Sequence, residues 1–446
     1  MNYRRIRFFS ILMIFLNVVF LFGCSKDPEL TVGPKDSVTF MVLSDIHYFD
    51  PSLFTLPANT YLQSYIASDR KMIVESSAIL QSALAAVEAK KPDFLLITGD
   101  LTKDGEKANH QILAKLFKSL SDKGIKVLVI PGNHDVYNPY SASFLQSTFK
   151  SVDNVNPDDF ASIYKNCGYS GAVQRDANSL SYVYEPVAGL WILAIDACHY
   201  WPVIETAGSI PEGTLSWIRS VMAEAKNRDK LVIAMMHHGL MEHFTNQNTL
   251  FPGYVINDWK NSSSKLSDLG IQVIFTGHFH AHDIVKKSAG TGGFIFDVET
   301  NSLVTWPSAY RTVTVDRIGR RMKIETGVLT DVTFSTIPKG MAFQSYSLDL
   351  LSNAIKDILY STLAAPPYSI PGTTIKNYGL DRIFANAVFA HFGGDEMPSA
   401  TDLADLQLVK MTSPALGEVL QNIWTDLPPA DKSITIDLVA GTETGN

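Results

Sequence analysis

The sequence has little cysteine and little positive charge. Its 446 residues contain three cysteines, and 37 Lys and Arg stand against 45 Asp and Glu, a formal net charge of −8 at pH 7. The excess of acid argues against a nucleic-acid polymer as partner, since such binding needs a basic face. If Cys24 is modified, only Cys167 and Cys198 could form a disulfide, and the sequence leaves that pairing open.

Internal repeats and low-complexity tracts are also missing. What is present is ordinary globular composition, with 46% apolar and 18% charged residues. A chain of this length and composition can bury one large core and a second, smaller one.

The first 23 residues have the order of a secretory signal. Three arginines precede a nearly continuous apolar run from Phe8 to Phe22, and Gly23-Cys24 follows. The run is short for a spanning helix, and its end resembles the lipobox of bacterial lipoproteins. We therefore expect a signal peptide over 1–23 and a lipidated Cys24 with a tether over 24–37. Cleavage would take the net charge from −8 to −11, because three arginines and no acids are removed. The expected location is the bacterial cell envelope, membrane-anchored and periplasmic or surface-exposed; the alternatives are simple secretion and an uncleaved anchor.

Beyond the tether, apolar runs alternate with amphipathic stretches. Strands are predicted near 38–43, 94–98, 126–131, 190–196, 230–236, 271–276, 293–298, 310–315 and 321–326. Helices are predicted near 69–90, 104–122 and 212–227. Continuous apolar strands that alternate with helices indicate a layered α/β domain, placed at 38–330. From about residue 337 the pattern becomes helical, which predicts a small helical C-terminal domain over 337–446.

Polar residues gather where the apolar strands end. The five groups are Asp45-Ile46-His47, Gly99-Asp100, Gly132-Asn133-His134-Asp135, His237-His238 and Gly277-His278-Phe279-His280. Ligands bind at the carboxyl ends of strands in open α/β sheets, and His with Asp suits divalent transition metals. About seven such ligands are too many for one ion and suit two ions that share a bridging carboxylate.

In this order the motifs resemble those of the calcineurin-like metallophosphoesterases, over about 38–330. The resemblance implies a four-layer αββα sandwich with a dimetal centre of iron, manganese or zinc. By motif, the ligands are divided as follows: Asp45, His47 and His280 on one ion, Asn133, His237 and His278 on the other, Asp100 between them, and His134 as the catalytic histidine. His237 takes the ligand position because it directly follows the strand, with His238 as the alternative.

The charges of such a centre suggest a mechanism. Two cations make hydroxide available from a bridging water at neutral pH and offset charge on the phosphoryl oxygens. His134 could protonate the leaving oxygen. Asp135 could orient His134, or could instead cap a helix.

Several further residues have two interpretations each. His282 continues the alternation of His278 and His280 along an expected strand, and is either a substrate contact or a supporting residue. His238 and His243 could line the pocket, and the alternative for His243 is a solvated loop. Asn138 and Tyr140 could shape the pocket or form a turn. The segment Ala390–Glu396, "AHFGGDE", could contact a metal or substrate, or could simply end a helix. His110 has no role and is expected on a surface helix.

The predicted function is hydrolysis of a small phosphate ester. A diester is favoured because the chain resembles the bacterial cyclic-nucleotide phosphodiesterase branch, and a phosphomonoesterase is the alternative. A catalytically silent binding lipoprotein would lack a ligand or the catalytic histidine, and none is missing. The C-terminal helices would either cover the active-site face or dock a partner.

Overall fold

The computed structural model describes residues 35–67, 69–200, 202–288, 293–366, 368–394 and 396–445. The predicted signal peptide, Cys24 and most of the tether lie outside these residues. No helix within the described ranges is both long and apolar enough to cross a membrane. Cys167 and Cys198 are free thiols, so the structure contains no disulfide between them.

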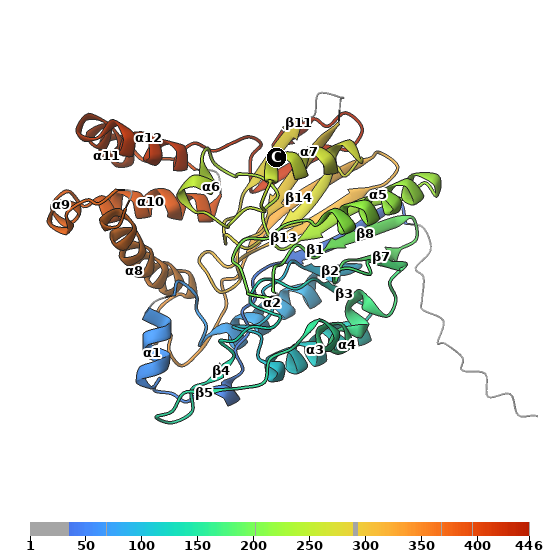
Figure 1. Ribbon diagram of the computed structural model, residues 1–446, viewed down its shortest axis with the longest axis horizontal. Coiled ribbons are helices and arrows are strands. Elements are labelled where there is room, and N and C mark those ends of the chain that lie inside the picture. Colours follow the sequence, from blue (N-terminus) through green and yellow to red (C-terminus); the bar gives the residue numbers. More distant parts are fainter. Residues whose placement is uncertain are drawn as a thin grey trace, which may run out of the picture. The chain divides into compact units, whose positions relative to one another are not determined.

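Two seven-stranded sheets form the α/β part of the fold (Figure 1). The first has the order β16-β15-β14-β13-β1-β2-β3 and the second β11-β12-β10-β9-β8-β7-β6. The strands of the first sheet are β1 Ser37–Leu43, β2 Phe94–Ile97, β3 Lys126–Val129, β13 Ala309–Asp316, β14 Arg321–Val328, β15 Ser433–Asp437 and β16 Glu443–Gly445. Those of the second are β6 Gln174–Arg175, β7 Tyr182–Val187, β8 Leu190–Ile195, β9 Leu231–Met236, β10 Val273–Thr276, β11 Ile284–Ser288 and β12 Phe294–Glu299.

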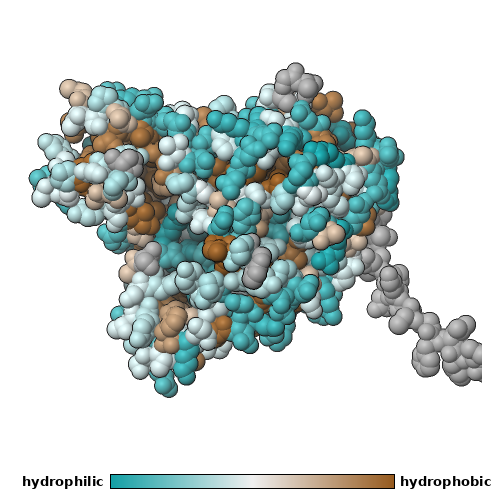
Figure 2. Space-filling model, in the orientation of Figure 1, coloured by the Kyte–Doolittle hydropathy of each residue, from teal (hydrophilic) through white to brown (hydrophobic). Residues whose placement is uncertain are grey.

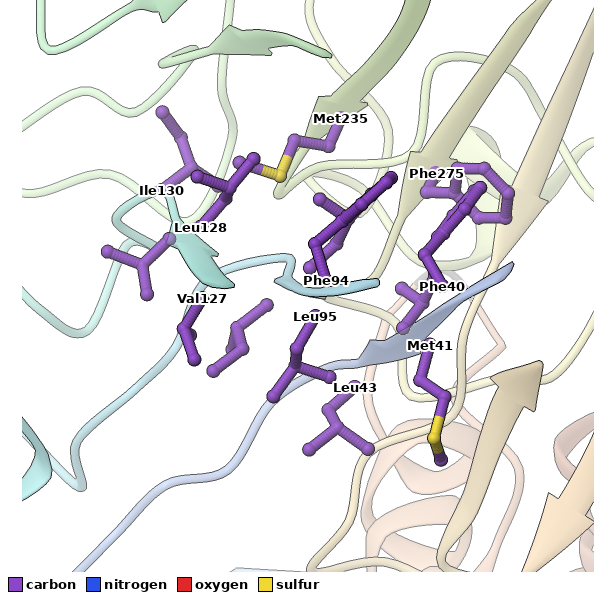
Figure 3. Packing of buried hydrophobic residues seen from close by; sticks show 14 of the residues in the cluster. Phe40, Met41, Leu43, Phe94, Leu95, Val127, Leu128, Ile130, Met235 and Phe275 are labelled. Atoms are coloured by element: carbon purple, nitrogen blue, oxygen red, sulfur yellow. The ribbon is translucent and has the colours of Figure 1, made fainter. Parts of the chain in front are cut away.

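The two sheets pack face to face through large apolar side chains (Figure 3). Phe40 of β1 stacks on Phe94 of β2, with ring centroids 4.7 Å apart. It also meets Phe275 of β10 edge to face at 5.5 Å, which joins the two sheets. Aromatic pairs in these geometries add stability beyond the area they bury.

Helices cover the outer faces of both sheets. Residues of α2 (Ser76–Lys90) and α3 (Lys107–Asp122) belong to the main apolar core, and α5 (Glu212–Asn227) and α7 (Trp259–Asp268) pack in a second core on the other sheet. The predicted αββα layering is therefore confirmed. Helix α2 begins seven residues later than the predicted 69, and 69–75 is irregular. His110 of α3 was expected at the surface but is fully buried, with Nδ1 2.9 Å from the Tyr164 hydroxyl.

The C-terminal helices pack around an apolar cluster of their own. They are α8 Phe343–Ala364, α9 Gly372–Tyr378, α10 Leu380–Gly393, α11 Ala400–Thr412 and α12 Pro414–Ile423. The prediction of a helical domain that extends to 446 is wrong at its end, because β15 returns to pair with β14. Apolar and polar residues alternate in Ser433–Asp437, and alternate positions are buried, as expected for a strand with one face on the core.

The remaining short elements connect these layers. They are α1 Thr60–Ala67, α4 Pro157–Ile163, α6 Gln247–Leu250, a two-stranded ribbon of β4 Ala142–Ser143 and β5 Lys150–Ser151, a 3₁₀ turn at Pro51–Leu53 and a π-helical turn at Lys165–Tyr169.

Parallel pairing brings the ends of five strands together. Strand β2 pairs in parallel with both β1 and β3, and β9 pairs in parallel with both β8 and β10. The loops that carry the polar motifs follow β1, β2, β3, β9 and β10, so they leave the two sheets at the same edge.

Candidate metal centre

The polar residues at the strand ends form two buried groups of ligand atoms. Asp45, His47 and His280 form one group, and Asp100, His237 and His278 form the other. Within each group the ligand atoms lie within 4.8 Å of one another. These are the two sets predicted from the motifs, apart from Asn133.

Asp100 lies between the two groups. Its Oδ2 is 3.5 Å from Nε2 of His47 and 3.4 Å from Nε2 of His237. Its Oδ1 accepts a hydrogen bond from the backbone N–H of His134. Asn133 joins the second group, since its Oδ1 lies 3.1 Å from Nε2 of His237. One carboxylate oxygen therefore faces both groups, as a bridging ligand requires.

Unusual backbone conformations set the directions of these side chains. The φ angles of five ligand residues are positive: Asp45 49°, His47 42°, Asp100 45°, His278 79° and His280 72°. Such conformations are uncommon for residues with a side chain and cluster at functional sites. The expectation that His278, His280 and His282 alternate along a strand is wrong, because β10 ends at Thr276. Left-handed turns, and not strand alternation, aim His278 and His280.

The donor atoms fit metal ions. Nε2 of His47 and Nε2 of His280 face each other at 3.3 Å, where at most one of them can donate a hydrogen bond. Oδ1 of Asp45 lies 3.3 Å from the same His280 nitrogen, is buried, and has no hydrogen-bond partner among the residues that the structure describes. Nδ1 of His237 is 2.8 Å from the Thr98 carbonyl, which fixes that proton and leaves Nε2 as a lone-pair donor. Convergent lone pairs of His, Asp and Asn suit two transition-metal ions.

His134 stands beside the two groups with a carboxylate behind it. Its Nδ1 lies 2.9 Å from Oδ1 of Asp104 and 2.9 Å from the Lys103 carbonyl. Burial lowers the pKa of His134, but the carboxylates of Asp100 and Asp104 raise it overall. Burial also acts against the charged form of Asp104, but the hydrogen bond from His134 and the charge of Lys103 lower its pKa to about 2.

Asp135 takes neither of its two expected roles, since His134 Nδ1 faces Asp104 and Lys103, and the residues after Asp135 form a turn and not a helix. The Asp135 carboxylate accepts hydrogen bonds from the backbone N–H groups of Gly132, Leu101 and Thr102. It therefore ties the loop after β2 to the loop after β3. Asp104 belongs to none of the sequence motifs. It lies four residues after Asp100, at the start of the predicted helix 104–122, so the sequence did not indicate its role.

The four candidate substrate contacts lie away from the cavity beside the ligands. His238 points Nε2 at the Thr206 carbonyl, 2.9 Å away, and packs on His278. Asn138 donates to the His134 carbonyl at 3.0 Å and supports that loop. His282 lies 2.7 Å from the Thr326 hydroxyl. His243 is fully buried and hydrogen-bonded to Asp283, so neither the pocket wall nor a solvated loop describes it.

A cavity of about 220 Å³ lies at the ligands, and none of the four candidate substrate contacts lines it. Besides Asp100, Asn133, His134, His278 and His280, its lining residues are Asp69, Arg70, Lys71, Thr206, Tyr254 and Ile358. Asp69, Arg70 and Lys71 precede α2 in the segment predicted to be helical. Ile358 comes from α8, so the helical region reaches the active-site face. Figure 2 shows the mainly hydrophilic face between the helical region and the sheets.

A second cavity of about 390 Å³ adjoins the first. Asp69, Lys71 and His134 line both. The rest of its wall is mostly aromatic: Tyr61, Tyr65, Tyr140, Phe144 and Phe149, with Lys103, Asp104 and Pro139. Tyr140, a sequence candidate for pocket shape, therefore faces this second cavity.

Residues 38–282, more than half of the chain, match the family of calcineurin-like phosphoesterases, and the chain belongs to this family. A probable cyclic nucleotide phosphodiesterase from Vesicomyosocius okutanii subsp. Calyptogena okutanii is 30% identical over 107 residues. That match spans 24% of this chain and 37% of the relative. Both ligand groups lie within the residues that match the family.

Two solved structures show a distant likeness in fold. A dimetal phosphatase from Danio rerio has 14% identity and a TM-score of 0.45, over 67% of this chain and 99% of its own. A purple acid phosphatase from yellow lupin (Lupinus luteus) seeds has 9% identity and a TM-score of 0.41, over 68% and 53%.

Proposed function

We propose that the protein hydrolyses a small phosphodiester. The observation that carries this proposal is the pair of cavities that meet at His134 and Lys71. A diester has an organic group on each side of its phosphorus, and the two cavities offer a separate place for each. The name of the curated relative, a probable cyclic nucleotide phosphodiesterase, supports the same substrate class.

The two ligand groups would hold two ions, with Asp45, His47 and His280 on one, Asn133, His237 and His278 on the other, and Asp100 shared. When bound, such ions supply a nucleophile at neutral pH and offset charge on the phosphoryl group. Iron, manganese and zinc all suit these ligands, and the metal content of the purified protein would identify them.

His134 would serve the leaving group. With Nδ1 held by Asp104 and the Lys103 carbonyl, Nε2 is the nitrogen available to the cavity. The neighbouring carboxylates favour the protonated imidazolium, which can give its Nε2 proton to the leaving oxygen. Lys71, paired with Asp69 at 3.2 Å, and Arg70 add positive charge on the cavity wall where a phosphoryl oxygen would lie.

The aromatic cavity would take the second ester group. Tyr61, Tyr140 and Phe149 are exposed at its rim, with 53%, 72% and 49% of their surface accessible. Aromatic faces of this kind stack on nucleobases and aryl groups. The combination suits an open-chain diester with one planar substituent, such as an aryl or nucleoside ester.

A phosphomonoesterase is the second candidate. Arg70 and Lys71 place two positive side chains on the cavity wall, and a monoester dianion would use both. A silent binding protein is disfavoured because the sequence retains all seven expected ligands and His134.

The test compares hydrolysis of bis-p-nitrophenyl phosphate with that of p-nitrophenyl phosphate by the manganese-loaded protein. We expect a diester preference that His134→Ala abolishes. Tyr140→Ala and Phe149→Ala should raise KM for the diester and leave KM for the monoester unchanged. If the protein preferred the monoester, and neither Tyr140→Ala nor Phe149→Ala changed KM for the diester, the protein would be a phosphatase.

We also propose anchoring in the cell envelope through lipid on Cys24. The basis is the order of residues 1–24 in the sequence. Metabolic labelling with a fatty acid should mark the wild-type chain and not Cys24→Ala; equal labelling of both would refute the anchor.

A further inference from the structure

A second group of acids, three buried and one half-buried, lies where the helical region meets the sheets and shares no residue with the dimetal centre. Asp283, Glu396, Asp426 and Asp431 bring carboxylate oxygens within 4.8 Å of one another. His391, near the end of α10, joins Asp283 and Glu396 in an overlapping group. The segment "AHFGGDE" is thus more than a helix end, since it supplies His391 and Glu396.

The contacts within this group come from three separate parts of the chain. Nδ1 of His391 lies 2.5 Å from Oε1 of Glu396 and 3.3 Å from Oδ2 of Asp283. Asp431, just before β15, accepts a hydrogen bond from the backbone N–H of Ile284 through Oδ1. Asp283 belongs to the loop after β10, Glu396 follows α10 and Asp431 precedes the returning strand.

Two of the carboxylate oxygens are buried and accept no hydrogen bond from the described residues, although one of them has the ion-pair contact of 3.3 Å with His391. They are Oδ2 of Asp283 and Oε2 of Glu396, on side chains that are 0% and 1% exposed. A buried charged oxygen left unsatisfied is costly, unless a positive group compensates it.

Negative groups also outnumber positive ones around the cluster. His243 lies between Asp283 and a further pair of acids, with Nδ1 2.7 Å from Asp283 and Nε2 3.3 Å from Asp297 and 3.6 Å from Glu299. Arg311, also fully buried, donates to the backbone carbonyls of Asp431, Asp283 and Glu299. The buried cations here are Arg311 and, when protonated, His243 and His391, and the exposed Lys432 follows Asp431 directly.

The backbone conformation of Gly394 allows the chain to pass close to the acid cluster. Its φ of 75° and ψ of 152° lie in a region essentially reserved for glycine. A Cβ there would come within 2.5 Å of the His282 carbonyl and 3.1 Å of Cβ of Asp431. Glycine therefore allows the chain after α10 to pass close enough to bring Glu396 to the other acids.

We propose that this cluster binds a third cation, a Ca²⁺-class divalent ion held by Asp283, Glu396, Asp426 and Asp431. Carboxylate oxygens are the ligands of such hard cations, and Ca–O distances of about 2.3–2.6 Å place opposite ligands about 4.6–5.2 Å apart. The four carboxylates each bring an oxygen within 4.8 Å of the others, close enough to share one ion. The ion fastens the helical region to the loop that carries His278 and His280.

The test uses the whole protein loaded with manganese, to which Ca²⁺ alone is added. Calcium per chain is measured by equilibrium dialysis, manganese by elemental analysis, and Tm by calorimetry. We expect one Ca²⁺ per chain and a rise in Tm of a few degrees. Glu396→Gln and, separately, Asp426→Asn should lose both effects and keep the manganese content of wild type.

The matched control is Glu418→Gln, which changes an exposed glutamate of the same helical region and should bind Ca²⁺ like wild type. Equal uptake of Ca²⁺ by wild type and both ligand variants would overturn the proposal. So would a wild type that takes up none, with Glu396→Gln raising Tm, since the acids would then be balanced by protons alone. A third manganese that Ca²⁺ does not displace would overturn the choice of ion. None of these results bears on the dimetal centre.

Discussion

Asp104 and His134 are joined by a contact of 2.9 Å between Oδ1 and Nδ1, across 30 residues of chain. The pair links the loop after β2 to the loop after β3, and it fixes which imidazole nitrogen faces the cavity. Asp104 is therefore a positioning residue for His134.

Asp104→Asn should lower kcat by about 10- to 100-fold, a part of the roughly 10²- to 10⁴-fold that a general acid contributes. The loss should be larger for an alkyl leaving group than for p-nitrophenolate, because a poor leaving group depends more on protonation. Steady-state kinetics with both esters measures this difference. Asp159→Asn, a surface aspartate paired with Lys107, is the control and should behave like wild type. Equal losses on both esters would assign Asp104 a purely structural role.

Asp100→Asn should disturb both metal positions. Its Oδ2 faces His47 and His237 together, and an amide neutralises the charge that two cations share. We expect fewer than two ions per chain by elemental analysis, with activity falling in parallel. Asp122→Asn, on the exposed end of α3, should keep the wild-type content. A variant that retains both ions at unchanged affinity would contradict the bridging assignment.

Acid should destabilise the protein partly through His110. Burial lowers the pKa of His110 to about 3, from an ordinary value near 6.5. Between these values the unfolded chain binds the proton and the folded chain does not, so this contribution is present above pH 6.5 and falls as pH drops toward 3. At about 1.4 kcal/mol per pKa unit, the contribution at pH 5 is smaller by about 2 kcal/mol than at neutral pH.

Urea unfolding of wild type and His110→Gln at pH 7 and pH 5 measures this contribution of His110 to the free energy of unfolding. The variant should be less stable at pH 7 because it loses the hydrogen bonds of a buried side chain, but it should lose less stability on acidification. His199→Gln, a more exposed histidine, should follow the wild-type slope. Identical slopes for His110→Gln and wild type would refute the assignment.

Phe40→Ala should lower the free energy of unfolding by about 3–5 kcal/mol, the usual cost of removing a buried aromatic side chain. Phe40 is fully buried and packs on both Phe94 and Phe275, so its loss leaves a cavity between the sheets. Ile318→Ala, at a position 75% exposed, should change stability by less than about 0.5 kcal/mol. Chemical denaturation checks both values.

The sequence predicted the strands and the polar groups at their ends because both signals are local. An apolar run of four to seven residues followed by Gly-Asp or Gly-Asn-His can be recognised without knowledge of the rest of the chain. The division of ligands between two groups came from the family resemblance, and the structure brings all seven residues together, six in the two groups and Asn133 beside His237.

The failures have tertiary causes. Residues 69–75 have helical spacing, but Met72 donates its backbone N–H to Val304 and Lys71 pairs with Asp69 beside the cavity. The positive φ of His278 and His280 depends on the neighbouring loop, where the backbone N–H of His278 donates to Asp45. Asp104 and His243 lie within ordinary polar stretches, and only the folded chain brings them to His134 and Asp283.

The return of β15 to the first sheet changes how the helical region is understood. Glu325 of β14 pairs with Ser433 of β15 in an antiparallel ladder, so the chain leaves the sheet and re-enters it at neighbouring positions. The five helices are thus an insertion into a hairpin and not a tail appended to a finished domain. A short turn between β14 and β15 would close the same ladder, so the strand order of the sandwich does not depend on the length or shape of what is inserted there.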